Sequence, residues 1–174
     1  MTTAASRVAI VIVTYNSARD IDRALRSLAD PPPATPHEIL VVDNASADDT
    51  VTRVRASWPG VRLIASPSNL GFAAANNRGI RESSSELVLL LNPDTSVPRG
   101  AIDRLVAHLD ARPDVAIVGP RIVDGEGRAE LSFGSMIAPL TELRQKVLVV
   151  GNDRGVRPIV SMVDRMTRRT REVD

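Results

Sequence analysis

"RVAIVIVTYNSARDIDRALRSLAD", residues 7–30, decides the fold class of this 174-residue chain. Its first part is a continuous β-branched run, which is typical of a strand buried on both faces of a parallel sheet. The run ends in TYN (14–16), and apolar residues then recur at helical spacing, at Ile21, Leu25 and Leu28. A buried strand followed at once by an amphipathic helix is the first half of a βαβ unit.

The same alternation continues downstream. Further buried strands are expected at 38–46, 60–66, 86–92 and 115–122, with helices between them. Ser17 with Asp20, and Ser46 with Asp49, have the spacing of helix starts. These features predict an α/β fold with a mostly parallel, Rossmann-like sheet and helices on both faces. Beyond about residue 125 the pattern loosens, and no further βα unit is expected.

Composition narrows the function classes. The chain has no cysteine, which excludes a disulfide framework, thiol catalysis and cysteine-ligated zinc. Its four aromatic residues are too few for the stacking platforms that bind single-stranded nucleic acid, so no nucleic-acid partner is expected. The apolar run near the N-terminus is far too short for a signal peptide or a membrane span. We therefore expect a cytoplasmic protein.

Polar residues gather where the expected strands end. Ligands of open parallel sheets bind outside the carboxyl ends of the strands, so separated polar clusters converge there. Three strands of this chain end in such clusters, namely Thr14, Tyr15 and Asn16; Asp43, Asn44 and Ser46; and Asn92 and Asp94. Each cluster alone has an ordinary reading as a helix cap or a turn. Three together indicate a ligand site.

The kind of ligand follows partly by elimination. The chain has neither a P-loop nor a G-x-G-x-x-G motif, and neither histidine is expected at the crevice. Asp94, on a loop at a strand end, is a suitable ligand for Mg²⁺ or Mn²⁺, which prefer carboxylate oxygens. A metal with few protein ligands normally shares its coordination with substrate phosphates. A nucleoside diphosphate derivative would supply them.

Four motifs, in this order and spacing, resemble the N-terminal half of family 2 glycosyltransferases with the GT-A fold, and the rhamnosyltransferase-like branch is closest. They are VAIVIVTYN, ILVVDNASADDT, NLGFAAANNRGI and LLLNPDTSVP. The resemblance covers about residues 7–135. It implies a sugar transferase that uses a UDP- or dTDP-linked donor, inverts the sugar carbon and acts on a glycan or lipid-linked acceptor in cell-wall or polysaccharide biosynthesis.

The resemblance also implies roles for particular residues. Thr14, Tyr15 and Asn16 would line the base and ribose pocket, and Asp43 would bond the pyrimidine edge or the ribose. The remaining nucleotide-binding candidates are Asn44, Ser46, Asn69, Gly71, Phe72, Asn77 and Asn92. Of these, Asn69, Gly71 and Asn77 would flank the nucleotide and pyrophosphate. Asp94 would be the metal-binding aspartate of the family's D-x-D motif.

Two departures from the family pattern stand out. Asn92 replaces the first aspartate of D-x-D, which removes one negative charge from the metal site. The family's general base, which inversion needs near the acceptor hydroxyl, has no counterpart between Glu130 and Asp174. We expect it beyond Asp174, so the sequence is interpreted as a fragment. Asp124 and Glu126 are the nearest candidates for a replacement base.

The expected organisation is a donor-binding GT-A half over 1–135 and an irregular or helical basic tail over 136–174, leading to a missing acceptor half. Two other functions stay open. One is a non-catalytic nucleotide-binding module, and the less favoured is a sugar nucleotidyltransferase.

The tail suggests a surface partner. From Arg144 onward it holds eight basic and four acidic residues. One helical face would carry Ile159, Met162, Val163 and Met166. This face would pack on the missing half, or lie on the inner face of a membrane as a basic amphipathic helix. A homodimer is a further open alternative.

Overall fold

The computed structural model describes residues 6–128, 152 and 155–167, with the side chains of Ile159, Met166 and Thr167 outside that description. The chain divides into two compact units, Met1–Ala116 and Ile117–Asp174. The first unit contains the sheet and all the predicted strand-end clusters. The domain boundary that we predict at residue 135 remains a prediction.

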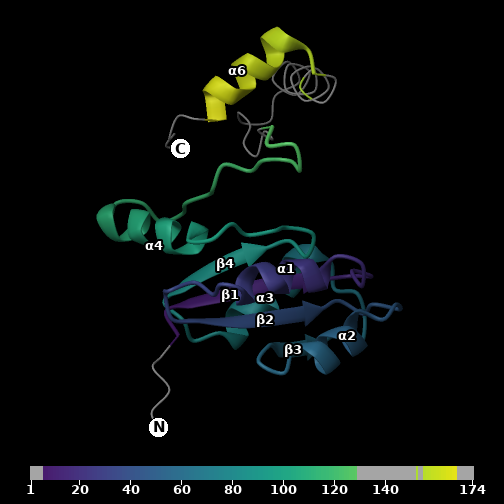
Figure 1. Ribbon diagram of the computed structural model, residues 1–174. Helices are drawn as coiled ribbons and strands as arrows, with labels where there is room; N and C mark the ends of the chain where they lie inside the picture. The colour runs from purple at the N-terminus through teal and green to yellow at the C-terminus, as the bar shows by residue number, and fades with distance from the viewer. Residues whose placement is uncertain (1–5, 129–151, 153–154, 168–174) are drawn as a thin grey trace. The chain divides into compact units, whose positions relative to one another are not determined.

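The first unit alternates strands and helices along the chain (Figure 1). Its elements are β1 (Val8–Thr14), α1 (Ile21–Ala29), β2 (His37–Asp43), α2 (Thr50–Ser57), β3 (Arg62–Ala65), α3 (Phe72–Glu82), β4 (Leu87–Leu91) and α4 (Ala101–Ala111). The four strands form one parallel sheet in the order β3-β2-β1-β4. The predicted α/β class and parallel sheet are confirmed.

The strand order fixes where a ligand can bind. The chain steps outward from β1 to β2 to β3 and then returns to place β4 on the other side of β1. The strand order therefore reverses at β1, between β2 and β4. Such a topological switch point is where open α/β sheets hold their ligands.

Helices cover both faces of the sheet. On one face, Ile10 and Ile12 of β1 pack with apolar residues of α1, α2 and α4 in one core cluster. On the other face, Val11, Val13 and Val42 pack with Ala75 of α3. The side chains of β1 are buried on both faces, which is why its sequence is continuously apolar rather than alternating.

The fourth strand differs from the expected buried run. Leu87, Leu89 and Leu91 are partly buried in the core cluster of α1 and α4, whereas Val88 is 39% and Leu90 49% exposed. The reason is topological: α3 packs on β1 and β2, and β4 is the edge strand of the described sheet. Composition shows that this run is apolar. It does not show that, within the described residues, no helix packs on the face of β4 that carries Val88 and Leu90.

The predicted strand at 115–122 is wrong. These residues have no strand assignment, and Ile117 is 88% exposed. A strand requires a hydrogen-bonded neighbour, and Pro120 lacks the N–H that a ladder needs. Apolar, β-branched composition therefore overpredicts a strand here.

The second unit contains one described helix, α6 (Arg157–Thr167). Val163 is fully buried and Met162 is 37% exposed. An ion pair joins Asp164 of α6 to Arg121. Of the predicted apolar face, Ile159 and Met166 lie outside the described side chains. No helix in the described part of the chain has the length and apolar character to span a bilayer.

Candidate functional site

The site begins with two neighbouring strand ends. Thr14 and Asp43 end β1 and β2 and are register partners. The Thr14 hydroxyl donates to Asp43 Oδ1 at 2.9 Å, and both residues are almost fully buried. The parallel register therefore brings together two polar residues that lie 29 positions apart in sequence. This pair lies at the carboxyl edge of the sheet.

Asp43 accepts most of its hydrogen bonds from its own loop. Ser46 donates to it twice, from the backbone N–H to Oδ2 at 2.9 Å and from the hydroxyl to Oδ1 at 2.6 Å. The sequence predicts that Ser46 starts a helix, but its hydroxyl binds Asp43 and α2 begins at Thr50. With three bonds made, the carboxylate keeps capacity for about one more donor.

The loop after β1 is held against the loop after β2. The Asn16 N–H donates to Ser46 Oγ at 2.8 Å, and Ala47 N–H donates to Asn16 Oδ1 at 2.8 Å. Asn16 and Ala45 have φ values of 52° and 66°, in the left-handed region that side chains disfavour. Strain of this kind persists only where surrounding bonds fix the backbone, and it concentrates at functional sites.

Asp48 adds a second connection between these loops. Its Oδ2 accepts from the Ala18 N–H at 3.0 Å, and its Oδ1 accepts from the N–H at 3.0 Å and the hydroxyl of Thr50. The Thr50 hydroxyl in turn accepts from the Ser17 N–H at 2.9 Å. Ser17 thus ends up before α1, which begins at Ile21.

These bonds also set the ionisation of Asp48. Partial desolvation raises the pKa of the carboxyl, but hydrogen bonds from Thr50 and Ala18 together outweigh it, and the pKa lies below its usual range. The group is therefore a carboxylate throughout the neutral range, and it accepts these bonds with a full negative charge.

Asn44 positions the third wall of the crevice. Its amide donates to Asn69 Oδ1 at 2.8 Å and accepts from the Leu70 N–H at 2.8 Å. Asn69 Oδ1 also accepts from the Gly71 N–H at 2.9 Å. Gly71 has φ 82°, which favours glycine, and α3 begins at the next residue. Buried Asn44 thereby sets the direction in which α3 enters.

The candidate residues divide into a buried frame and an exposed rim. Thr14, Asp43 and Asn44 are buried, and their bonds fix the loops. Tyr15 is 55% and Phe72 62% exposed. The other exposed candidates are Asn16, Asn69, Gly71, Asn77, Asn92 and Asp94. Exposed apolar rings beside polar side chains suit a ligand that has both a flat base and hydrogen-bonding edges.

Asn92 and Asp94 follow β4, the strand on the opposite side of β1. Arg23 of α1 donates to the Asp94 carbonyl at 3.2 Å and pairs with Asp20 at 2.8 Å, which anchors this loop. The Asp94 carboxylate is left exposed. Within the described residues, no three carboxylate or histidine side chains gather as a protein-only metal site would require. A metal at Asp94 needs other ligands, such as phosphate oxygens.

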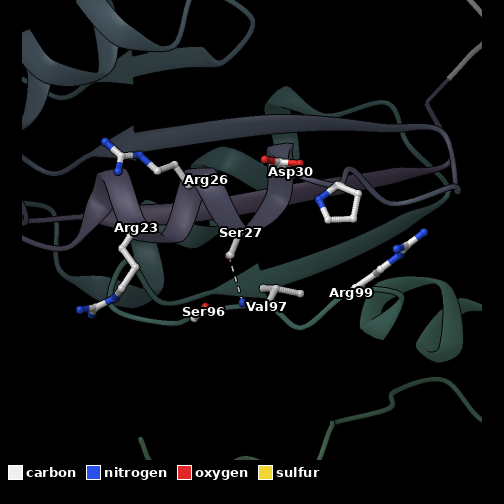
Figure 2. Close-up of a pocket in the computed structure, with 8 residues that line it drawn as sticks. Arg23, Arg26, Ser27, Asp30, Ser96, Val97 and Arg99 are labelled. Atoms are coloured by element: carbon white, nitrogen blue, oxygen red, sulfur yellow. Dashed lines mark hydrogen bonds between the residues drawn. The ribbon is translucent and has the colours of Figure 1, made fainter.

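A shallow hollow of about 440 Å³ lies beside this anchor, between α1 and the loop after Asp94 (Figure 2). The Ser27 hydroxyl on its wall accepts from the Val97 N–H at 3.0 Å. The guanidinium groups of Arg23, Arg26 and Arg99 point in different directions in Figure 2, so they do not converge on one anion. The hollow is separate from the strand-end frame.

The two candidates for a replacement base form a small cluster with Arg128. Arg128 Nε donates to Asp124 Oδ2 at 2.7 Å, and Arg128 forms an ion pair with Glu126 at 3.1 Å. The Arg128 side chain is the main cause of the lowered pKa of Asp124, and backbone N–H groups contribute. A lowered pKa weakens a carboxylate as a proton acceptor, which makes Asp124 a poor general base.

Sequence reasoning did not identify Asp48 or Arg23 as parts of this region. Asp48 lies in the quoted ILVVDNASADDT motif, and its distance of two residues from a threonine is a signal for a local turn bond. The Arg23 contact to Asp94 spans 71 residues and has no local signal.

A parallel α/β sheet with a polar frame at its switch point places the protein in the class of open-sheet ligand-binding folds. The model of glycosyl transferase family 2 matches residues 9–168. The chain belongs to this family.

Characterised relatives are similar over most of the chain. It is 32% identical, over 68% of its own length and 42% of the relative's, to N-acetylglucosaminyl-diphospho-decaprenol L-rhamnosyltransferase of Mycobacterium tuberculosis. It is 34% identical to the succinoglycan biosynthesis protein ExoO of Rhizobium meliloti, over 81% of this chain and 40% of that one. The chain thus spans about two fifths of these relatives.

Solved structures show the same fold. The mannosyltransferase PcManGT from Pyrobaculum calidifontis, in complex with GDP-Man and Mn²⁺, has a TM-score of 0.58 and 27% identity, over 70% of this chain and 37% of that one. TarS of S. aureus in complex with UDP-GlcNAc has a TM-score of 0.54 and 26% identity, over 62% and 32%. The predicted GT-A fold and family are confirmed.

Proposed function

We propose that the crevice at the ends of β1, β2 and β4 binds a nucleoside diphosphate sugar, the donor of a glycosyl transfer. The observation that carries this proposal is the Thr14–Asp43–Asn44 frame, which joins the ends of β1 and β2 to the loop before α3. Relatives with this fold are solved with UDP-GlcNAc and with GDP-Man and Mn²⁺.

The frame supports a pyrimidine nucleotide such as UDP or dTDP. Asp43 is an acceptor with one position left, which suits a pyrimidine N–H or a ribose hydroxyl. Exposed Tyr15 and Phe72 offer apolar surface to the base. Asn16 retains its amide N–H₂, because only its oxygen is bonded to Ala47. We assign Thr14, Tyr15, Asn16, Asp43 and Ser46 to the nucleoside end of the site.

The diphosphate is assigned to the region between α3 and the loop after β4. The start of α3 presents backbone N–H groups that favour an anion; Asn69 and Gly71 lie just before it, and Asn77 lies within the helix. Mg²⁺ or Mn²⁺ held by Asp94 would neutralise the charge and complete its coordination with phosphate oxygens. Exposure of Asp94 fits this role. Asn92 would contribute a neutral oxygen in place of a second carboxylate.

Transfer to a glycan or lipid-linked acceptor is proposed for the whole protein. Inversion needs a general base beside the acceptor hydroxyl. The Arg128-bound Asp124 is unsuited to that role, because the ion pair lowers its pKa. Synthesis of cell-wall or extracellular polysaccharide is the process in which we place this reaction.

Binding and transfer assays separate the alternatives. The chain of 174 residues should bind UDP, and a chain of its relatives' full length should transfer sugar from a UDP- or dTDP-linked donor. A binding module would bind UDP without transfer at either length. A sugar nucleotidyltransferase would form a nucleotide sugar from a nucleoside triphosphate and a sugar phosphate, which we expect not to be observed.

The tail provides a separate proposal about location. We place the protein in the cytoplasm, with the basic tail in contact with the inner face of the membrane. The exposed Met162 on α6 supports such a contact, whereas the burial of Val163 favours packing of that face on protein. Sedimentation with vesicles tests it: pelleting that depends on anionic lipid supports membrane contact, and its absence ends the idea.

A further inference from the structure

A carboxylate with no predicted role in binding connects the two loops that frame the nucleoside end of the crevice. Asp48 reaches from the loop after β2 to the Ala18 N–H in the loop after β1, at 3.0 Å. The same carboxylate holds both the N–H and the hydroxyl of Thr50. One of its three acceptor contacts therefore joins segments 30 residues apart, and the other two hold Thr50, whose hydroxyl accepts from the Ser17 N–H.

Tyr15 and Asn16 lie between the end of β1 and these contacts, and Asn16 is also bonded to Ser46 and Ala47. Tyr15 is mostly exposed and has little packing of its own. Asn16 is held in the left-handed region, at φ 52°. On their C-terminal side, two backbone N–H groups donate to side-chain oxygens: Ser17 N–H to Thr50 Oγ1 at 2.9 Å, and Ala18 N–H to Asp48 Oδ2. Without this anchor, the strained backbone can relax.

We propose that Asp48 is a positioning residue for nucleotide binding, which acts by holding Tyr15 and Asn16 in the conformation that receives the base. This inference rests on the proposed nucleotide site. A loop that is ordered before binding does not lose its freedom on binding, so affinity is higher. A loop that populates the competent conformation only part of the time lowers the apparent affinity by that fraction.

The chain contains a matched control. Asp103 on α4 binds the loop before β2 in the same pattern: Oδ2 accepts from the Ala34 N–H at 3.2 Å, and Oδ1 accepts from the N–H and hydroxyl of Thr35, each at 2.8 Å. That loop leads into the amino end of β2, at the edge of the sheet opposite the crevice. Asp48→Asn and Asp103→Asn therefore each place an amide N–H₂ against an N–H donor.

The experiment compares UDP affinity in the parent, Asp48→Asn and Asp103→Asn, each measured where the protein is fully folded. We expect both variants to lose stability, because both lose hydrogen bonds to a charged acceptor. Only Asp48→Asn should lose UDP affinity, by about tenfold, because only its loop receives the base. Unchanged affinity in Asp48→Asn, or equal losses in both variants, would overturn the inference.

A spectroscopic signal separates this inference from the proposed function. Tyr15 is the single tyrosine of the chain, so incorporated 3-fluorotyrosine gives one ¹⁹F resonance from this loop. It should shift or broaden in Asp48→Asn and stay unchanged in Asp103→Asn, both without UDP. If the parent does not bind UDP, the proposed function fails while this signal still tests the positioning role. An unaltered signal in Asp48→Asn would contradict that role.

If Asp48→Asn does not fold, Thr50→Val replaces it. Valine fills the space of this fully buried threonine but removes the hydroxyl that accepts from Ser17. The same changes in UDP affinity and in the Tyr15 resonance are expected, and their absence would count equally against the inference.

Discussion

The buried residues of this site make most of their hydrogen bonds to other residues of the protein, which leaves few for a ligand. Asp43 makes three internal hydrogen bonds, and Asn44 makes two. A buried polar group of this kind costs free energy if one partner is removed, so its loss disturbs the loops as well as any ligand. Binding data on these residues therefore need a folding control.

Asp94 is the clearest case of a residue free for a ligand. Its side chain is exposed and its loop is anchored through the backbone carbonyl, not the carboxylate. We predict that Mn²⁺ tightens UDP binding to the parent and that Asp94→Asn removes this gain while it preserves most of the metal-free affinity. Calorimetry with and without Mn²⁺ measures both quantities. Equal affinity for UDP in the parent under the two conditions would remove the metal from the account.

Asp103 predicts a pH dependence of stability. Hydrogen bonds from the backbone N–H and hydroxyl of Thr35, and from Ala34, lower the pKa of Asp103 in the folded chain. The unfolded chain, with a pKa of about 3.9, takes up the proton first as pH falls, so the contribution is full above about pH 5 and is lost progressively below about pH 4.

Asp103→Asn lacks this titration. The difference in unfolding free energy between parent and variant should be constant from pH 7 to pH 5 and shrink toward pH 3, as followed by urea unfolding at each pH. A difference that stays constant down to pH 3 would show that the bonds to Asp103 do not favour its ionised form.

At the scale of elements, the packing of α3 on the sheet positions one wall of the crevice. Gly79 allows this approach: a Cβ there would lie 2.4 Å from Val11 Cγ1 and 3.1 Å from Val42 Cγ2. Both valines are fully buried and cannot move aside freely. The helix therefore lies as close to β1 and β2 as a glycine permits.

We predict that Gly79→Ala destabilises the protein by about 1–3 kcal/mol through overpacking. Gly60→Ala is the control, since a Cβ there meets no atom within 4 Å, and it should change stability by no more than about 0.5 kcal/mol. Thermal or urea unfolding measures both variants. If Gly79→Ala is as stable as Gly60→Ala, α3 has room to shift and does not define the wall.

The sequence predicts elements well where the signal is local or the burial is two-sided. The run at β1 is buried throughout, and its neighbours follow at βαβ spacing. The serines at 17 and 46 mislead because their hydroxyls bond to other groups: Ser17 to the backbone of Tyr15, and Ser46 to Asp43 and to the Asn16 N–H. The segment 115–122 misleads because strand formation depends on a partner that composition does not reveal. The Arg23 contact to Asp94 is likewise non-local.

At the scale of the molecule, we assign this chain a frame for a nucleotide and a metal residue, Asp94, whereas Asp124 is unsuited as the general base. A positioned base contributes about 10²–10⁴-fold to proton-transfer reactions. We therefore predict that the 174-residue chain binds UDP but transfers sugar near the background rate with any donor and acceptor pair. Robust transfer that is lost in Asp124→Asn or Glu126→Gln would show that the base lies within this chain.

The central claim is that the frame around Asp43 holds a nucleotide, and titration calorimetry of UDP tests it most directly. The parent should show saturable binding, and Asp43→Ala should weaken it by about 1–3 kcal/mol, because the N–H or hydroxyl of the bound nucleoside loses its acceptor. Both proteins must be shown to be folded by their unfolding transitions. Equal affinity in the two proteins, or no saturable binding of UDP by the folded parent, would contradict the account.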